Sequence, residues 1–376
     1  MFLFFWGCFL LFPQLCCGVP EKVKVSLITI AGAGEHFWGN TISMAQAAAD
    51  DLDIDLEVLY ANRNHIKAIE LAREVCRRRE KPDYLIVVSE KKIGGKSLAL
   101  AQKAGIDTML FGSLTEDEEQ RFGRPRQQLS HWIGSRAVNE FALGRETAAA
   151  LVNRGFEQGL TDDEGFLNII ALAGEDATSY SDGRVRGLLD ALQDDRKTRL
   201  LQVVPTDWTE SDGYRVTVGL YHRYEKRFGR KIGAVWAANS QLALGAIRAG
   251  KEMGFTAGED FVISAIEWED EALDSVAGGE LLTVNGGRFA ELALMLVMLY
   301  DYHHGLDFMD DGGEVSGGLS LTRKNLAEYQ QLFASGDWQQ IDFTRFSKVL
   351  SPDVHNYSLT FSEIMAQFVQ EPKQSD

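Results

Sequence analysis

Short apolar segments rich in β-branched residues alternate with segments of helical periodicity along most of this chain. The first apolar run is Val23 to Ile30, and a helix-like segment separates it from the next run at Leu56 to Tyr60. Further apolar runs predict strands at 84–88, 108–111, 166–173, 200–204, 232–237, 261–266 and 281–284. Strands and helices that alternate at this pitch form βαβ units, so the sequence predicts an α/β fold with parallel, doubly covered sheets.

The alternation is interrupted between residues 113 and 131. This stretch is charged, contains Gly123 and Pro125, and has no apolar period, which predicts a long loop or an approach to a hinge. A helix is expected over 136–154, after which the strand–helix pattern restarts. The chain therefore divides into two doubly wound halves of similar size, and its 376 residues are enough to build two cores.

The N-terminal segment predicts a secretory signal peptide over residues 1–18. Its first 12 residues are apolar and uncharged, and small or soft residues lead up to Gly18, where we expect cleavage. No Lys or Arg precedes the apolar run, so a lipid anchor at Cys16 or Cys17 and an uncleaved membrane anchor stay open. Cleavage would leave Cys76 as the sole cysteine, so we expect no internal disulfide and no zinc site.

The charge balance excludes several classes of partner. The chain has 38 Lys and Arg against 55 Asp and Glu, a formal net charge of -17. A strongly acidic protein is repelled by the phosphates of nucleic acids and by anionic lipid headgroups. The sequence therefore predicts neither nucleic-acid binding nor docking on an anionic membrane.

Ligands of open parallel sheets bind outside the carboxyl ends of the strands, so the residues that follow each predicted strand are candidates for binding. An aromatic ring can pack on the C–H face of a sugar, while carboxylates, amides and arginine hydrogen-bond to its hydroxyls. These types gather at the predicted strand ends, and the candidate ligand-binding residues are Phe37, Trp38, Glu90, Arg184, Trp208, Asn239, Glu267 and Asn285. For each aromatic residue, packing in the core or the hinge is the alternative.

No motif indicates a cofactor or a catalytic centre. The glycines at 32, 34 and 39 are spaced too widely for dinucleotide binding, and the chain has neither a P-loop nor a Gly-x-Ser-x-Gly elbow. Glu90 and Glu267 could form an acid/base pair, which leaves a secreted carbohydrate-active enzyme as an alternative. We expect binding of a small polyhydroxylated ligand without catalysis, without a cofactor and without a metal ion.

Three segments carry a resemblance to a known family. VWAANSQLALGAIRAGKEMG (235–254), FVISAIEW (261–268) and LLTVNGGRFAELAL (281–294) resemble the second lobe of type I periplasmic solute-binding proteins of the ribose-binding branch. The resemblance implies ligand contacts for seven of the candidates, with Asn239 opening a helix and Asn285 preceding the hinge: Phe37, Trp38, Arg184, Trp208, Asn239, Glu267 and Asn285. Glu90 is a candidate from the strand-end rule alone. Ser240 and Glu267 depart from the aspartates usual in that family. HWIGS (131–135), Asn139 and GEDATSYSDGR (174–184) resemble LuxP-type receptors.

The resemblance implies two lobes joined by a three-segment hinge, with the ligand clamped between them. The expected first lobe comprises residues 23–133 and 268–300, the second 134–267 and 301–350, and residues 351–376 form a C-terminal tail. The implied protein is a periplasmic monomer that presents a sugar-like ligand to a membrane ABC permease or a sensor kinase. A LuxP-type signal receptor without transport is the alternative within the same fold.

Overall fold

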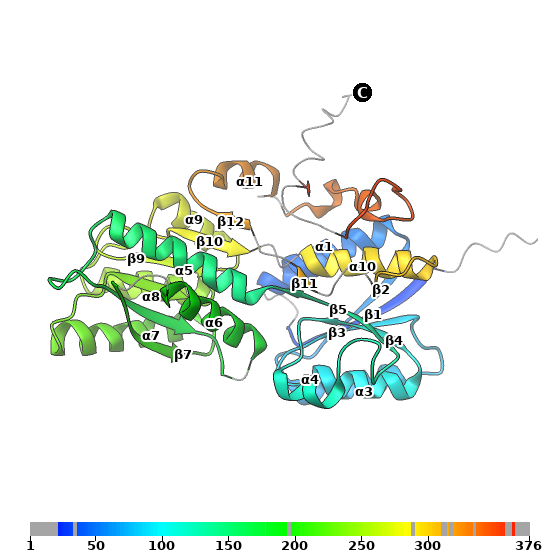
Figure 1. Cartoon of the computed structure of the whole chain (residues 1–376). Helices are drawn as coiled ribbons and strands as arrows, with labels where there is room; N and C mark the ends of the chain where they lie inside the picture. Colours follow the sequence, from blue (N-terminus) through cyan, green and yellow to red (C-terminus); the bar gives the residue numbers. More distant parts are fainter. Residues whose placement is uncertain are drawn as a thin grey trace, which may run out of the picture.

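The protein is described by a computed structural model, in which residues 22–32, 36–176, 178–193, 197–286, 290–309, 314–315, 319–333, 336–357 and 363–364 are placed. They form two α/β lobes that lie side by side (Figure 1). The predicted signal peptide at 1–18 and most of the predicted C-terminal tail lie outside the described residues. None of the described helices is long and apolar enough to span a membrane.

The first lobe is built on a six-stranded sheet in the order β11-β5-β4-β3-β1-β2. All neighbouring strands in this sheet are parallel. The strands are β1 (Val23–Thr29), β2 (Ile54–Tyr60), β3 (Tyr84–Val88), β4 (Asp107–Phe111), β5 (Trp132–Val138) and β11 (Glu314–Val315). Every residue of β3 is buried, as expected for a central parallel strand covered on both faces.

Helices cover both faces of the first sheet. Figure 1 shows α1 and α10 above the strands and α3 and α4 below them. The helices are α1 (His36–Asp51), α2 (His65–Arg77), α3 (Gly94–Ala104), α4 (Glu116–Phe122) and α10 (Ala290–His303). Gly105 ends α3 in a left-handed conformation with φ of 67°, which glycine adopts without steric cost.

The second lobe repeats this strand order in the sheet β12-β10-β9-β8-β6-β7. Five strands are parallel and β12 is antiparallel to β10. The strands are β6 (Leu167–Ala173), β7 (Thr198–Pro205), β8 (Ala234–Ala237), β9 (Val262–Ile266), β10 (Thr283–Gly286) and β12 (Leu319–Leu321). The helices are α5 (Glu140–Glu157), α6 (Ser179–Gln193), α7 (Glu210–Tyr221), α8 (Ser240–Glu252), α9 (Asp270–Gly278) and α11 (Leu326–Phe333). A π-helical turn at His222–Arg227 extends α7.

Helices α5 and α6 approach each other unusually closely because glycines lie at their contact. A Cβ atom on Gly144 would lie 2.0 Å from the carbonyl oxygen of Arg184, and one on Gly187 would lie 2.1 Å from that of Phe141. No side chain fits at either position without moving the backbone. This contact places Arg184 against Glu140 at the first turn of α5.

Successive described elements belong to different lobes at four places. The lobe changes after β5, from β10 to α10, from β11 to β12, and from α11 to the 3₁₀ turn at Trp338–Gln340. The first three crossings correspond to the predicted three-segment hinge. The fourth was not predicted; it returns the C-terminal segment to the first lobe, where the 3₁₀ turns at Trp338–Gln340 and Phe343–Phe346 pack on α1.

The strand pairing corrects the predicted lobe boundaries. Residues 268–286 are predicted for the first lobe, but β10 pairs with β9 and belongs to the second. Residues 134–138 and much of 301–350 are predicted for the second lobe, but β5, β11 and the two C-terminal 3₁₀ turns belong to the first. Sheet membership depends on which strand lies alongside, and that pairing is not encoded locally in the sequence.

The segment 113–131, which was predicted to be a long loop or an approach to a hinge, also differs from its prediction. It contains α4, which opens with a capping box at Thr115 and Glu118, and it leads into strand β5. The helix predicted over 136–154 is wrong in its first residues, because it begins at Glu140. The β5 sequence WIGSRAV holds glycine, serine and arginine, so it lacks the apolar run by which the other strands were recognised.

The C-terminal segment is anchored to the first lobe by Asp301 of α10. This fully buried carboxylate accepts hydrogen bonds from the hydroxyls of Ser347 and Tyr357 and from the backbone N–H of Lys348, the last at 2.7 Å. The backbone N–H of Val349 is a fourth donor, at 3.4 Å, and these hydrogen bonds to one carboxylate fix the segment in place.

Replacing Asp301 with asparagine should therefore release this segment. One oxygen becomes an amide that faces donors, which costs about 1–3 kcal/mol of local stability. We expect faster proteolytic cleavage C-terminal to α11, measured by limited digestion and mass spectrometry. Asp274→Asn, at an exposed position on α9, is the matched control. Equal digestion rates for the two variants would contradict this account.

Candidate functional site

A cavity of about 470 Å³ lies between the two lobes. Its lining residues follow the carboxyl ends of strands in both sheets, as the strand-end rule predicts. The volume lies within the usual range for small-molecule sites. The described lining residues are Trp38, Arg63, Glu90, Lys91, Glu175, Thr178, Tyr180, Asp207, Trp208, Thr209, Asn239, Gln241, Glu267 and Glu269.

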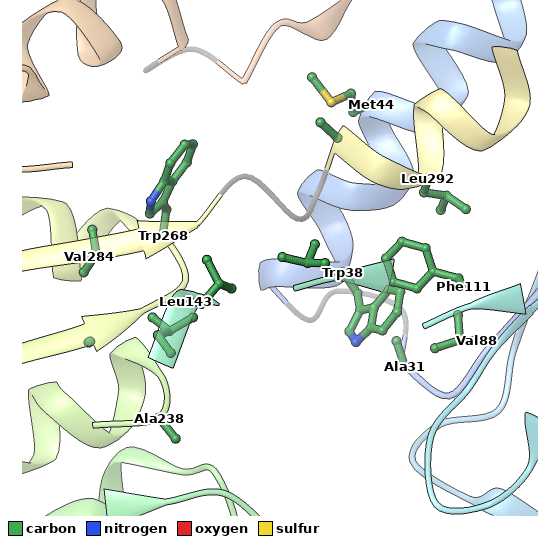
Figure 2. Close-up of a cluster of buried hydrophobic side chains, with 14 of the residues drawn as sticks. Ala31, Trp38, Met44, Val88, Phe111, Leu143, Ala238, Trp268, Val284 and Leu292 are labelled. Atoms are coloured by element: carbon green, nitrogen blue, oxygen red, sulfur yellow. The ribbon is translucent and has the colours of Figure 1, made fainter. Parts of the chain in front are cut away.

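The first-lobe wall is built around Trp38 at the start of α1. Figure 2 shows its indole beside Phe111, Val88 and Ala31, at the ends of the first-lobe strands. The rings of Trp38 and Phe111 are 5.9 Å apart between centroids, and Trp38 is buried. Packing therefore fixes the indole at the edge of the cavity, as a rigid apolar surface.

The second-lobe wall is built around Trp208, which follows β7. Its indole covers Gly174, where a Cβ atom would lie 1.9 Å from the ring. The side-chain amide of Asn239 donates to the Trp208 carbonyl at 3.0 Å, and its oxygen caps α8 by accepting from Leu242 N–H at 2.9 Å. One asparagine thus connects the start of α8 to the loop that carries the aromatic wall.

Arg184 lies directly behind this wall and is fully buried. It donates to Glu140 at 2.6 Å, to the Ala238 carbonyl at 2.6 Å and to Glu267 at 2.9 Å. Its guanidinium carbon lies 5.6 Å from the centre of the Trp208 ring. Burial alone lowers the pKa of this guanidinium, but the charges of Glu140 and Glu267 and their hydrogen bonds outweigh burial and raise that pKa.

Two direct contacts join the lobes beside the cavity. The Tyr180 hydroxyl on α6 donates to the carbonyl oxygen of Ser89 at 2.9 Å. Lys91 of the first lobe lies 3.2 Å from Glu175 of the second. Gly112 leaves room for the tyrosine, since a Cβ atom there would lie 2.2 Å from the hydroxyl oxygen. The described structure is therefore a form in which the lobes touch.

Backbone strain is concentrated in the cavity wall. Arg63, Lys91, Trp208 and Glu267 have φ angles of 58°, 48°, 70° and 76°. They make up half of the eight non-glycine residues with positive φ among the described residues. Such conformations cost about 1–3 kcal/mol each and persist at positions where the surrounding structure imposes them, often at functional sites.

Five of the eight predicted site residues line the cavity: Trp38, Glu90, Trp208, Asn239 and Glu267. Arg184 lies behind them and reaches the cavity through Glu267. Asn285 is fully buried, donates to Glu146 of α5 at 2.7 Å and does not line the cavity. Its backbone oxygen accepts from Glu267 N–H at 2.7 Å, so it positions a lining residue. The Phe37 side chain lies outside the described residues.

Several lining residues were not among the predicted candidates. Arg63 follows β2, and applying the strand-end rule to that strand would have identified it. Its guanidinium lies 3.5 Å from the Glu90 carboxylate. Gln241 lies two residues beyond the predicted Asn239, and Glu269 lies two residues beyond the predicted Glu267. Residues at the start of these helices carried no separate signal in the sequence. Asp207 and Lys91 immediately flank predicted residues.

The site offers hydrogen bonds and apolar surface. Over the described chain, no group of three or more His, Cys, Asp and Glu side chains is arranged to hold a metal ion. The two indoles can pack on a flat ring, and the carboxylates and amides can accept or donate hydrogen bonds. Such an arrangement suits reversible binding of a small polar molecule.

Comparisons with known proteins agree with this architecture. Residues 26–305 match the family described as periplasmic binding protein domain. The galactofuranose-binding protein YtfQ of Escherichia coli (strain K12) is 26% identical over 113 residues, 30% of this chain and 35% of that protein. The sequence match thus spans about a third of that relative's length.

Solved structures share the two-lobe fold. A periplasmic sugar-binding protein from Pseudomonas fluorescens has a TM-score of 0.80 and 29% identity, over 92% of this chain and 99% of that one. An ABC transporter solute-binding protein from Actinobacillus succinogenes, with bound D-allose, has a TM-score of 0.69 and 18% identity, over 82% and 100% of the two chains. The chain belongs to the periplasmic binding protein family, with the type I two-lobe fold that the sequence resemblance implies.

Proposed function

We propose that this protein binds a small sugar-like, polyhydroxylated molecule between its lobes and delivers it to a membrane ABC importer. The observation that supports this proposal most directly is the interlobe cavity, which has an indole on each lobe and carboxylate and amide groups between them. An indole contacts the C–H face of a sugar ring, and carboxylates accept hydrogen bonds from its hydroxyls. The names of similar structures, which mention D-allose and myo-inositol, support this ligand class.

The proposal places the protein in the periplasm, after removal of the leader near Gly18. The family description and the apolar leader support this location. We propose that the protein acts as a monomer and that the eight predicted residues act in binding, with Arg184 and Asn285 positioning the residues that touch the ligand. A sensor protein as the membrane partner would use the same cavity, and the relatives described as transporter components favour the importer.

The enzyme alternative lacks support in the geometry. Glu90 is paired with Arg63 and Glu267 with Arg184. An ion pair with arginine holds each carboxylate in place as a hydrogen-bond acceptor. The arrangement therefore suits fixed hydrogen-bond acceptors, and we propose a binding protein without turnover.

A ligand screen tests the proposal. The mature protein is mixed with pentoses, hexoses and inositols, and its melting temperature and binding heat are measured. A ligand at 100 times its Kd should stabilise the folded protein by about 2.7 kcal/mol. We expect one-to-one binding, with the sugar recovered unchanged by chromatography. Binding by no member of the panel, or release of a product at catalytic rates, would contradict the proposal.

A further inference from the structure

The cavity carries a marked excess of negative charge. Its described lining holds five carboxylates, Glu90, Glu175, Asp207, Glu267 and Glu269, against two cations, Arg63 and Lys91. Including the buried pair of Arg184 and Glu140 behind the wall leaves the same excess of three formal charges. A cleft with charges of one sign and low-dielectric walls concentrates the electric field inside it.

Each cation at the cavity already has a carboxylate partner. Arg63 lies 3.5 Å from Glu90, Lys91 lies 3.2 Å from Glu175, and Arg184 is held between Glu140 and Glu267. An anionic ligand at any of these cations would lie close to the carboxylate that already pairs with it and would be repelled by that charge. Buried charges without a partner are costly, so sugar acids and sugar phosphates are disfavoured.

The carboxylates Asp207 and Glu269 lie on the second-lobe side and receive hydrogen bonds from neutral groups. Asp207 accepts from the backbone N–H of Thr209 at 3.0 Å and from its hydroxyl, and the hydroxyl contributes most to lowering the pKa of this carboxyl. Glu269 accepts from the Ser240 hydroxyl at 2.9 Å and from the Gln241 amide. Asp207 thus carries its charge at neutral pH.

The aromatic side chains of the cavity also favour a positively charged ligand. The guanidinium of Arg184 already lies over Trp208, which shows that one face of this indole accommodates a cation. Trp38 lines the cavity from the opposite lobe. Indole rings attract cations within about 6 Å of the ring centre, and the attraction grows when water is excluded.

We infer that the ligand is a polyhydroxylated molecule that carries a protonated amine, such as an amino sugar or an aminocyclitol. This inference rests on the proposed function and narrows its ligand class. Hydroxyls hydrogen-bond to the polar wall, while the ammonium group is held by the excess carboxylates and the indole faces. The electrostatic contribution weakens as ionic strength rises.

Matched sugars test the charge of the ligand. D-Glucose, D-glucosamine, N-acetyl-D-glucosamine and D-glucuronate are compared by calorimetry with the corresponding galactose and mannose series. In at least one series the free amine should bind 10-fold or more tightly than the neutral and acetylated forms. The uronate should not bind, and the advantage of the amine should shrink in 0.5 M salt. Equal or tighter binding of the neutral form overturns the inference and leaves the proposed function standing. Binding of none of these hexoses overturns the inference; the proposed function fails only if the pentoses and inositols of the screen do not bind either.

Variants of the cavity test which groups hold the amine. Asp207→Asn and Glu269→Gln keep the shape of each side chain and remove its charge. Each should weaken binding of the amino sugar about 10-fold more than it weakens binding of the neutral parent. Glu271→Gln, at an exposed position two residues beyond Glu269 and outside the cavity lining, should change neither. Equal losses for charged and neutral sugars would indicate altered shape and overturn the inference.

Discussion

Replacement of Arg184 with methionine is expected to lower the free energy of unfolding by about 3–5 kcal/mol. Methionine fills a similar volume but leaves the buried Glu140 and the nearly buried Glu267 without their shared cation. It also removes the hydrogen bond to the Ala238 carbonyl, which lies next to the start of α8. Ligand binding should be lost with the same substitution, because Glu267 and the face of Trp208 both depend on this guanidinium.

Denaturant unfolding and calorimetric titration measure the two effects of Arg184→Met separately. The control is Arg186→Met on the same helix, whose exposed side chain pairs with the exposed Asp182. An exposed ion pair contributes about 0–1 kcal/mol, so the control should unfold and bind almost as the parent does. If both variants lose similar stability, the buried charge cluster does not have the importance that its geometry indicates.

Truncation of Trp208 to alanine should weaken ligand affinity about 30-fold or more with little loss of folding stability. Removal of a central aromatic side chain from a binding site commonly costs 2 kcal/mol or more, and 1.4 kcal/mol corresponds to a factor of ten. The positive φ of residue 208 makes the parent backbone costly, so alanine adds no new strain there. Calorimetric titration with a ligand from the screen gives the affinity.

Two further variants make the Trp208 result specific. Gly174→Ala should also weaken binding, because its Cβ atom would displace the indole while the tryptophan remains. Phe228→Ala removes an exposed aromatic ring elsewhere in the second lobe and should leave affinity unchanged. Retained affinity in Trp208→Ala would show that this indole does not contact the ligand.

Periodicity predicted most of the two sheets, because parallel strands buried on both faces read as continuous apolar runs. The buried strand LNIIALA of β6 is an example. Strand β5 escaped prediction because its buried Arg136 is neutralised by Glu291 of α10, a partner 155 residues away. The predicted lobe boundary near residue 267 was wrong for a related reason. Only the pairing of β10 with β9 shows which sheet residues 283–286 join.

The candidate site was predictable where it depends on strand ends. Trp38, Glu90, Trp208, Asn239 and Glu267 each follow a strand, and the parallel topology brings these ends to one cavity. The position of Arg184 behind the wall depends on the glycine contact between α5 and α6, which joins distant segments. The pairing of each cation with a carboxylate could not be predicted from the sequence either, because the partners come from different loops.

The contacts from Tyr180 to Ser89 and from Lys91 to Glu175 also bear on ligand release. They stabilise the arrangement in which the lobes touch through the protein's own atoms, so we expect a larger fraction of molecules to adopt it before ligand arrives. We expect full separation of the lobes to require that both contacts break. Under the proposed function, a membrane partner that takes the ligand would separate these two pairs of residues, so the energy of two contacts within the protein enters the free energy of ligand release.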